Sequence, residues 1–139
     1  MSRPDFYWEC GGFIVNEGPA VIRHGNRLFV SYSASATDEN YCMGLLWIDV
    51  AADPMKAENW QKSPQPVFKT SWENRQFGPG HNSFTVTEQG EDVLVYHARD
   101  YTEIEGDPLY DPNRHTCIKT FTWDSDGMPV FGEPPAAVD

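Results

Sequence analysis

Apolar and polar residues alternate along most of this chain with the two-residue period that is typical of β-strands. Short clusters of glycine, asparagine, aspartate or proline interrupt the alternation, as expected of hairpin turns. The predicted strands are 20–23, 28–33, 44–50, 82–87, 93–98, 117–123 and 130–131. Residues 53–60 have room for one helical turn, and no helix longer than about three turns is expected. The pattern therefore predicts an all-β fold.

The two halves of the chain share one pattern at a spacing of 64 residues. In each half a polar segment enters a strand, a turn follows, and the next strand ends in Tyr-x-Ala. Repeated short strands at such a period are typical of propeller blades, and two unrelated hairpins in a β-sandwich are the alternative. Pro64 and Pro66 exclude a central strand and mark a connection. We therefore expect a partial propeller, with a first blade over about 1–68 and a second over about 69–139.

The apolar faces of the paired hairpins predict a core. Side chains on these faces alternate with polar ones that point to the other side of the strand. The residues expected to be buried are Val21, Phe29, Val30, Tyr32, Leu45, Val93, Leu94, Tyr96, Ile118 and Phe121.

Composition narrows the classes of partner. The net charge of −11 would repel phosphate backbones, so no nucleic-acid partner is expected. No apolar run approaches the roughly 18 residues of a membrane span, and the first residues lack the apolar core of a signal peptide. The three cysteines form no CxxC pair, which argues against a zinc site or a disulfide framework. The cellular location of the protein is left undetermined.

Glu17 and His81 occupy equivalent positions at the entry of the first strand in each half. In a propeller that strand lines the central channel, so both side chains are expected to face one cavity. The aromatic residues Trp8, Tyr7 and Phe13 precede Glu17 and would supply walls for it. An acid in such surroundings suits a glycosidase general acid, whereas a solvated turn glutamate is the alternative.

Arg114 precedes the last long strand, where its guanidinium would fork onto a carboxylate or sugar hydroxyls. A surface ion pair is the alternative. No second carboxylate stands out as a base, because Asp38, Asp100, Asp107 and Asp111 lie in loops without a distinguishing context. The acidic loop lacks the order of an EF-hand and is interpreted as solvated rather than as a calcium site.

Several segments resemble glycoside hydrolase family 43, whose five-bladed β-propellers act on arabinose- and xylose-containing polymers. They are Trp8-Glu9-Cys10, Val15-Asn16-Glu17-Gly18-Pro19-Ala20, Tyr32-Ser33-Ala34-Ser35, Tyr41-Cys42-Met43-Gly44-Leu45-Leu46, Phe77-Gly78-Pro79-Gly80-His81-Asn82-Ser83, Tyr96-His97-Ala98-Arg99 and Gly106-Asp107-Pro108-Leu109-Tyr110-Asp111-Pro112-Asn113-Arg114-His115. The chain is most similar to the α-L-arabinofuranosidase-like subgroup. The resemblance implies about two four-stranded blades, from the C-terminal part of a five-bladed propeller.

The resemblance also implies roles for individual residues. Glu17 matches the general acid of the E-G-P motif, and His81 matches the histidine of G-H-N-S, which lies near an axial calcium or similar ion and its waters. Arg114 resembles an arginine that reaches the active site, and Arg114 and Trp8 are expected to bind substrate. The implied mechanism is inverting, with acid and base about 6.5–9.5 Å apart. The base belongs to earlier blades that this chain lacks.

These implications give three hypotheses for function. The first is a glycosidase fragment that carries the acid without its base and is inactive alone. The second is an enzyme that becomes active when another chain completes the propeller, and the third is a carbohydrate-binding or self-assembling module. The expected partners are an arabinose- or xylose-containing saccharide and either further copies of the chain or a missing N-terminal portion. The sugar, its linkage and endo or exo action stay open.

Overall fold

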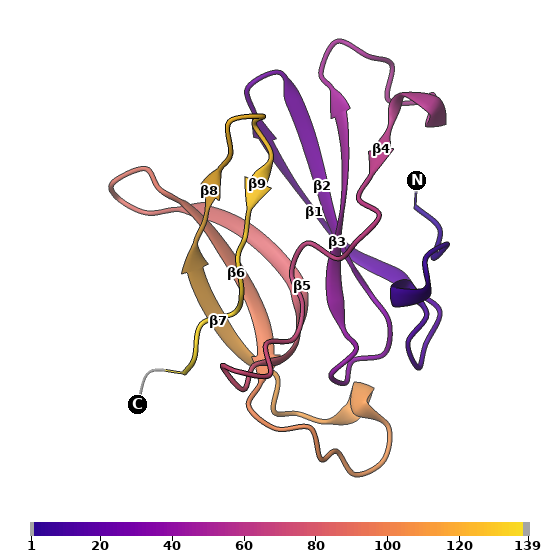
Figure 1. Cartoon of the computed structure of the whole chain (residues 1–139), viewed down its shortest axis with the longest axis vertical. Helices are drawn as coiled ribbons and strands as arrows, with labels where there is room; N and C mark the ends of the chain where they lie inside the picture. Colours follow the sequence, from indigo (N-terminus) through magenta and orange to yellow (C-terminus); the bar gives the residue numbers. More distant parts are fainter. Residues whose placement is uncertain (1, 138–139) are drawn as a thin grey trace.

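The computed structural model describes residues 2–137. They form nine strands and three one-turn 3-10 helices, arranged as two main antiparallel sheets that lie side by side (Figure 1). One of the short helices, η2 (Ala57–Asn59), lies where a helical turn was expected. None of the helices formed by the described residues has the length or apolarity to cross a membrane. The all-β prediction is confirmed.

The first sheet is an antiparallel meander with the strand order β1-β2-β3-β4. Its strands are β1 (Asn16–His24), β2 (Arg27–Ala34), β3 (Cys42–Asp49) and β4 (Gln61–Lys62). Gly25, with φ of 56°, forms the tight turn between β1 and β2, as its place between two alternating segments predicts. The register of β1 shifts between Glu17 and Ala20, so the strand is irregular where it begins.

The second sheet has three strands rather than the expected four. They are β5 (Phe77–Val86), β6 (Asp92–Arg99) and β7 (His115–Thr120), and the remaining pair is β8 (Thr122–Trp123) with β9 (Pro129–Val130). β8 and β9 pair with each other in a separate two-stranded sheet, joined by a sharp turn that follows Trp123. The Asp124 carboxylate accepts the backbone N–H groups of Asp126 and Met128, which closes the turn.

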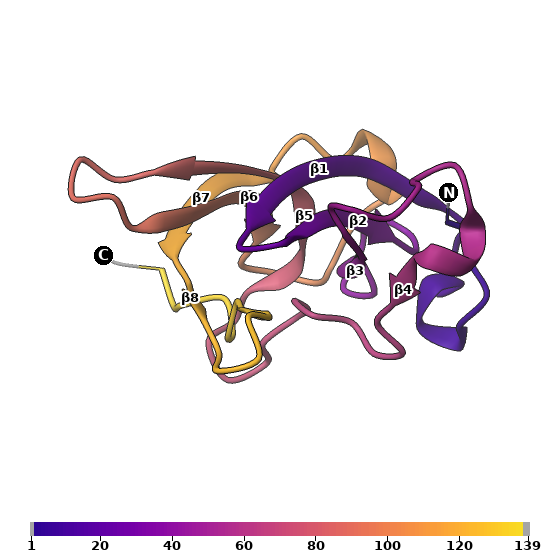
Figure 2. The same cartoon turned by 90° about the horizontal axis from the view of Figure 1, so that it is seen from above.

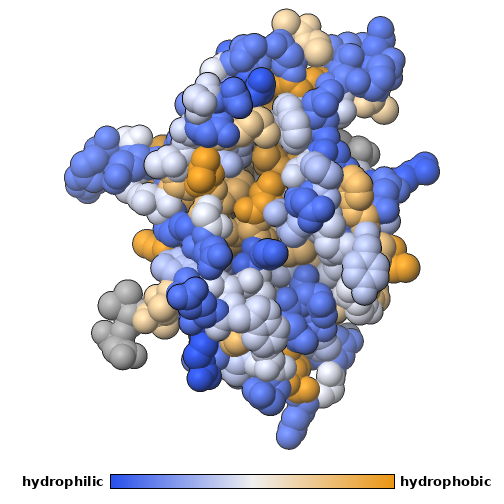
Figure 3. Space-filling model, in the orientation of Figure 1, coloured by the Kyte–Doolittle hydropathy of each residue, from blue (hydrophilic) through white to orange (hydrophobic). Residues whose placement is uncertain are grey.

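The main core lies between the two sheets and beneath the β8–β9 hairpin. Its buried members are Phe29, Met43, Leu45, Phe68, Leu94, Tyr96, Ala98, Phe121 and Phe131. Phe121 and Phe131 pack within 4.9 Å of each other between ring centroids, so the hairpin covers the core instead of extending the sheet. Figure 3 shows hydrophobic side chains near the centre of one face, where the sheets meet, among hydrophilic ones.

Eight of the ten side chains expected in the core are buried, and two are not. Val21 is 57% exposed and Ile118 is 69% exposed, so these two predictions are wrong. Both residues lie on sheet-edge strands, and their neighbours Ile22 and Cys117 are the ones that pack on the core. Because side chains alternate between faces, Val21 and Ile118 point away from it.

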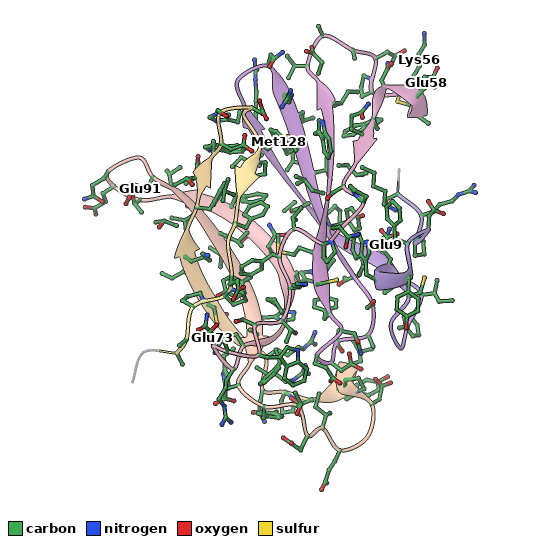
Figure 4. The ribbon with its side chains drawn as sticks, viewed as in Figure 1. Glu9, Lys56, Glu58, Glu73, Glu91 and Met128 are labelled. Carbon is green, nitrogen blue, oxygen red and sulfur yellow. The ribbon has the colours of Figure 1, made fainter. Side chains whose placement is uncertain are left out.

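The opposite face of the first sheet is covered by the N-terminal segment, residues 2–15. Trp8 packs there on a cluster that includes Tyr32 and Leu46. Glu9 anchors the segment: it is fully buried beside the sheet (Figure 4), 2.8 Å from Lys62 Nζ, and accepts the Tyr32 hydroxyl at 2.7 Å. Burial by itself raises the pKa of Glu9, but hydrogen bonds from Lys62 and other donors outweigh it and hold the pKa below its ordinary value.

The first strands of the two sheets, β1 and β5, contact each other, and Figure 2 shows them running past one another at the centre of the molecule. The connection between the sheets is held at both ends, by a bridge from Met43 to Phe68 and another from Ser71 to Gln76. The expected division near residue 68 falls in this connection and stays a prediction. The packing of β1 on β5 is what places the site described next.

Candidate functional site

Glu17 and His81 meet where β1 and β5 begin. His81 Nδ1 lies 3.2 Å from Glu17 Oε2, which confirms the predicted convergence of the two side chains. Gly18 permits the approach, since a Cβ there would lie 3.0 Å from the His81 ring. His81 itself has a left-handed backbone with φ of 47°, and its N–H donates to Ser33 Oγ at 2.7 Å. A non-glycine residue in this region is strained, and such strain concentrates at functional sites.

Tyr41 lies beneath this pair and was given no role by the sequence. Its hydroxyl donates to Glu17 Oε1, and its side chain is almost completely buried. Burial raises the pKa of Tyr41, and the hydrogen bond to Glu17 raises it further, so the phenol stays protonated. The Gly-Pro-Gly run of residues 78–80 was an available signal for a closely packed ring below it.

His97, on β6, stacks on Tyr41 with ring centroids 5.5 Å apart and lies near His81. Neither of its ring nitrogens has a hydrogen-bond partner among the described residues. Burial lowers the pKa of His97 to about 4, helped by the charge of Arg114 and other nearby cations. His97 is therefore a neutral imidazole at neutral pH, in the lining of the same pocket as Glu17.

One wall of the site is the loop between β6 and β7, which lies at the same end of the molecule as the β2–β3 connection (Figure 1). Arg99 holds this loop from within. It donates to Asp111 Oδ1 at 3.0 Å, to the Pro108 carbonyl at 2.9 Å and to the Thr37 carbonyl of the β2–β3 connection. Burial alone would raise the pKa of Asp111, but hydrogen bonds from Tyr101 and others outweigh it and lower the pKa.

These elements enclose an open pocket of about 990 Å³. Its polar lining includes Glu17, Tyr41, His81, His97 and Arg114, and its apolar lining includes Phe13, Val15, Pro108, Leu109 and Pro112. The structure therefore brings three of the four predicted site residues, Glu17, His81 and Arg114, to one cavity. An open pocket that has carboxyl groups and an arginine among apolar walls suits a polar ligand.

The family model of glycosyl hydrolases family 43 matches residues 3–129. This chain belongs to that family. It is 57% identical, over 98% of its length, to an extracellular exo-alpha-(1->5)-L-arabinofuranosidase of Streptomyces avermitilis, and 54% identical to alpha-L-arabinofuranosidase 43 of Humicola insolens over 96% of its length. In both comparisons the chain spans only 28% of the relative.

Solved structures agree with this membership. An alpha-L-arabinofuranosidase from Lactobacillus brevis superposes with a TM-score of 0.97 at 55% identity, covering 100% of this chain and 43% of that one. A thermostable family-43 glycoside hydrolase gives a TM-score of 0.79 at 29% identity, also covering 43% of that chain. The two sheets are therefore part of the family's propeller, and the chain corresponds to a fragment of these relatives.

Trp8 is the predicted site residue that the structure places elsewhere. It does not line the pocket; it stacks between Phe6 and Tyr32 on the first sheet and donates its indole N–H to the Pro64 carbonyl at 3.0 Å. Trp8 thus has a packing position in this chain, and its expected contact with substrate stays a prediction. Of the aromatic walls expected before Glu17, Phe13 lines the pocket and Tyr7 is almost fully exposed.

The carboxylates considered as partners for Glu17 are committed to local turns. Asp38 accepts the backbone and side-chain N–H groups of Asn40 at 2.8 and 2.9 Å. Asp107 accepts the Leu109 N–H at 2.9 Å, and Asp111 accepts from Arg99. All three line the pocket, and each has a carboxylate oxygen held by these local bonds.

The resemblance implies an axial ion beside His81, and the chain alone does not supply its ligands. His81 Nδ1 faces Glu17, and residues 2–137 hold no group of three or more His, Cys, Asp or Glu side chains that would bind a metal. A calcium ion needs six to eight oxygen ligands. Calcium therefore stays a prediction that requires waters or groups from outside these residues.

Proposed function

We propose that this chain supplies the general acid and part of the sugar pocket of an inverting, arabinofuranosidase- or xylosidase-like glycosidase. The observation that carries the proposal is the carboxyl group of Glu17, which stands in the pocket between Tyr41 and His81. Relatives named as arabinofuranosidases support an arabinose-containing saccharide as the ligand. The apolar walls suit the faces of sugar rings, and Arg114 suits their hydroxyl groups.

In this mechanism Glu17 donates its proton to the glycosidic oxygen as the bond from that oxygen to the anomeric carbon breaks. A water molecule attacks the opposite face of the sugar, and a second carboxylate must accept its proton. The other carboxylates of the pocket are held in turns, so we assign the base to a part of the propeller outside this chain. Alone, the chain is then expected to bind saccharide without hydrolysing it.

The test is titration of the chain with an arabinose-containing oligosaccharide, followed by NMR, with hydrolysis measured in parallel. We expect weak binding that shifts signals of Glu17, His81 and Arg114, and no turnover. Arg114→Gln should weaken the binding, whereas Arg23→Gln, at an exposed arginine on β1, should not. Signals that shift only away from the pocket would contradict the proposal. Hydrolysis by the isolated chain would show that a base lies within it.

Completion of the propeller is a further part of this proposal. The exposed apolar side chains Val21, Val86 and Ile118 lie on β1, β5 and β7, and apolar surface of this kind favours association. We therefore propose that the chain associates with copies of itself or with a further portion of the propeller. Light scattering measures the outcome, and a monomer at high concentration would contradict self-association. Hydrolysis that appears only in an assembled species would favour completion by another chain.

A further inference from the structure

Both the ring and the hydroxyl group of Tyr41 make specific contacts. It directly precedes β3, and its ring lies against β5, where a Cβ on Gly80 would come 2.4 Å from Tyr41 Cε1. Gly80 therefore leaves room for the ring, and the stack on His97 fixes its plane.

The hydroxyl group of Tyr41 donates its hydrogen bond to one acidic partner, Glu17 Oε1. Packing alone would be served equally well by phenylalanine, because the Gly80 and His97 contacts involve the ring. A buried phenol that stays protonated can only donate to a carboxylate. His81 Nδ1 lies 3.2 Å from Oε2 and 3.3 Å from Oε1, so the Tyr41 hydroxyl is the group that distinguishes the two oxygens.

Glu17 needs such a partner because the backbone around it does little to orient its side chain. Its side chain is 35% exposed, and it lies where the register of β1 shifts beside the left-handed Gly18. A flexible side chain at an irregular strand end gains a defined orientation only from groups that bind its carboxyl oxygens.

We propose that Tyr41 is a positioning residue: its hydroxyl binds Glu17 Oε1 and fixes the orientation of the carboxyl group that serves as the acid. This inference rests on the proposed role of Glu17 as the acid, although the hydrogen bond itself is independent of that role. When Glu17 gives its proton to the glycosidic oxygen, the carboxylate that remains keeps its bond from Tyr41.

The test compares Tyr41→Phe with the unaltered chain at one neutral pH, by the three-bond NMR couplings that report the side-chain rotamers of Glu17. The couplings should report one dominant rotamer in the unaltered chain, and in Tyr41→Phe they should average towards several, because the hydroxyl that binds Oε1 is gone. Couplings that keep the values of the unaltered chain would overturn the proposal.

Two matched variants separate this effect from a general loss of packing. Tyr32→Phe removes a phenol that donates to Glu9, and Tyr96→Phe removes a buried hydroxyl that has no partner among the described residues. Both should leave the Glu17 couplings unchanged, and an equal change in either would overturn the assignment. Should Tyr41→Phe fail to fold, the unaltered chain must itself show one dominant Glu17 rotamer, and averaged couplings would be equally decisive.

Neither readout needs saccharide or turnover, so the two proposals fail separately. If the chain binds no saccharide but Glu17 loses its single rotamer in Tyr41→Phe, the Tyr41 contact stands and the glycosidase proposal falls. If the chain binds saccharide in the pocket and the Glu17 rotamer is the same in Tyr41→Phe, the glycosidase proposal stands and the role of Tyr41 falls.

Discussion

Replacing Arg99 by methionine is the sharpest test of how the pocket wall is held. Arg99 is 3% exposed and donates to Asp111, to the Pro108 carbonyl and to the Thr37 carbonyl, so it joins two loops that both line the pocket. Methionine keeps much of the apolar stem and removes every donor. The change therefore breaks the connection without emptying the space.

The expected loss is about 3 kcal/mol of unfolding free energy. Two backbone carbonyls lose the donor that satisfied them, and each buried group left unpaired costs about 1–3 kcal/mol. Asp111 loses less, because it keeps the Tyr101 hydroxyl at 2.8 Å and the Asn113 N–H at 3.0 Å. The total therefore comes mainly from the two carbonyls.

The assay is urea unfolding followed by tryptophan fluorescence, together with hydrogen exchange of the amides of Leu109 and Asn113, whose N–H groups are bonded within the loop. Both amides should exchange faster in Arg99→Met. The control is Arg75→Met, because Arg75 is exposed and its side chain makes a long contact of 3.4 Å to the Asp100 carbonyl. It should change stability by less than about 0.5 kcal/mol.

Arg99→Met would refute this account if its unfolding free energy matched that of Arg75→Met and the loop amides exchanged at the rate of the unaltered chain. The loop would then owe its position to its prolines and local turns. A loss of stability with unchanged loop exchange would likewise place the contribution of Arg99 in the sheet and not in the pocket wall.

Three further changes test the packing around the site. Gly80→Ala should destabilise the fold by more than about 2 kcal/mol, because it forces a Cβ against Tyr41. Gly25→Ala, with open space around it, should cost only about 1 kcal/mol because of the positive φ at that position. Urea unfolding of the two variants measures the difference. The fold lowers the pKa of His97 to about 4. The stability that the neutral imidazole contributes is therefore complete above pH 6.5 and is lost as the pH falls towards 4, by at most about 3 kcal/mol. His97→Gln should flatten the dependence of the unfolding free energy on pH over this range, and an unchanged dependence would contradict the prediction. Glu9→Gln should lower the unfolding free energy by about 3 kcal/mol at pH 7, because Lys62 loses its buried partner. Since the pKa of Glu9 is lowered, the difference in unfolding free energy between the two chains should shrink as the pH falls through and below 4.5. A difference that stays constant with pH would contradict the prediction.

The sequence by itself determined the class of fold, the hairpins and the meeting of Glu17 with His81. Alternation and turn residues are local signals, and they placed the strand expected at 28–33 within β2 and the turn at Gly25. The repeat added one long-range fact, because equivalent positions of neighbouring blades lie at the same end of adjacent inner strands. The resemblance likewise rested on short motifs that can be read residue by residue.

Only the tertiary structure decided which faces are covered and which residues support the site. A period of two residues says that Val21 and Ile22 point in opposite directions, but not which of them meets the second sheet. The roles of Tyr41, His97 and Arg99 arise between segments far apart in the chain, and Trp8 packs on the first sheet because the N-terminal segment folds back over it. Contacts of this kind depend on the packing of side chains in three dimensions, which local periodicity does not encode.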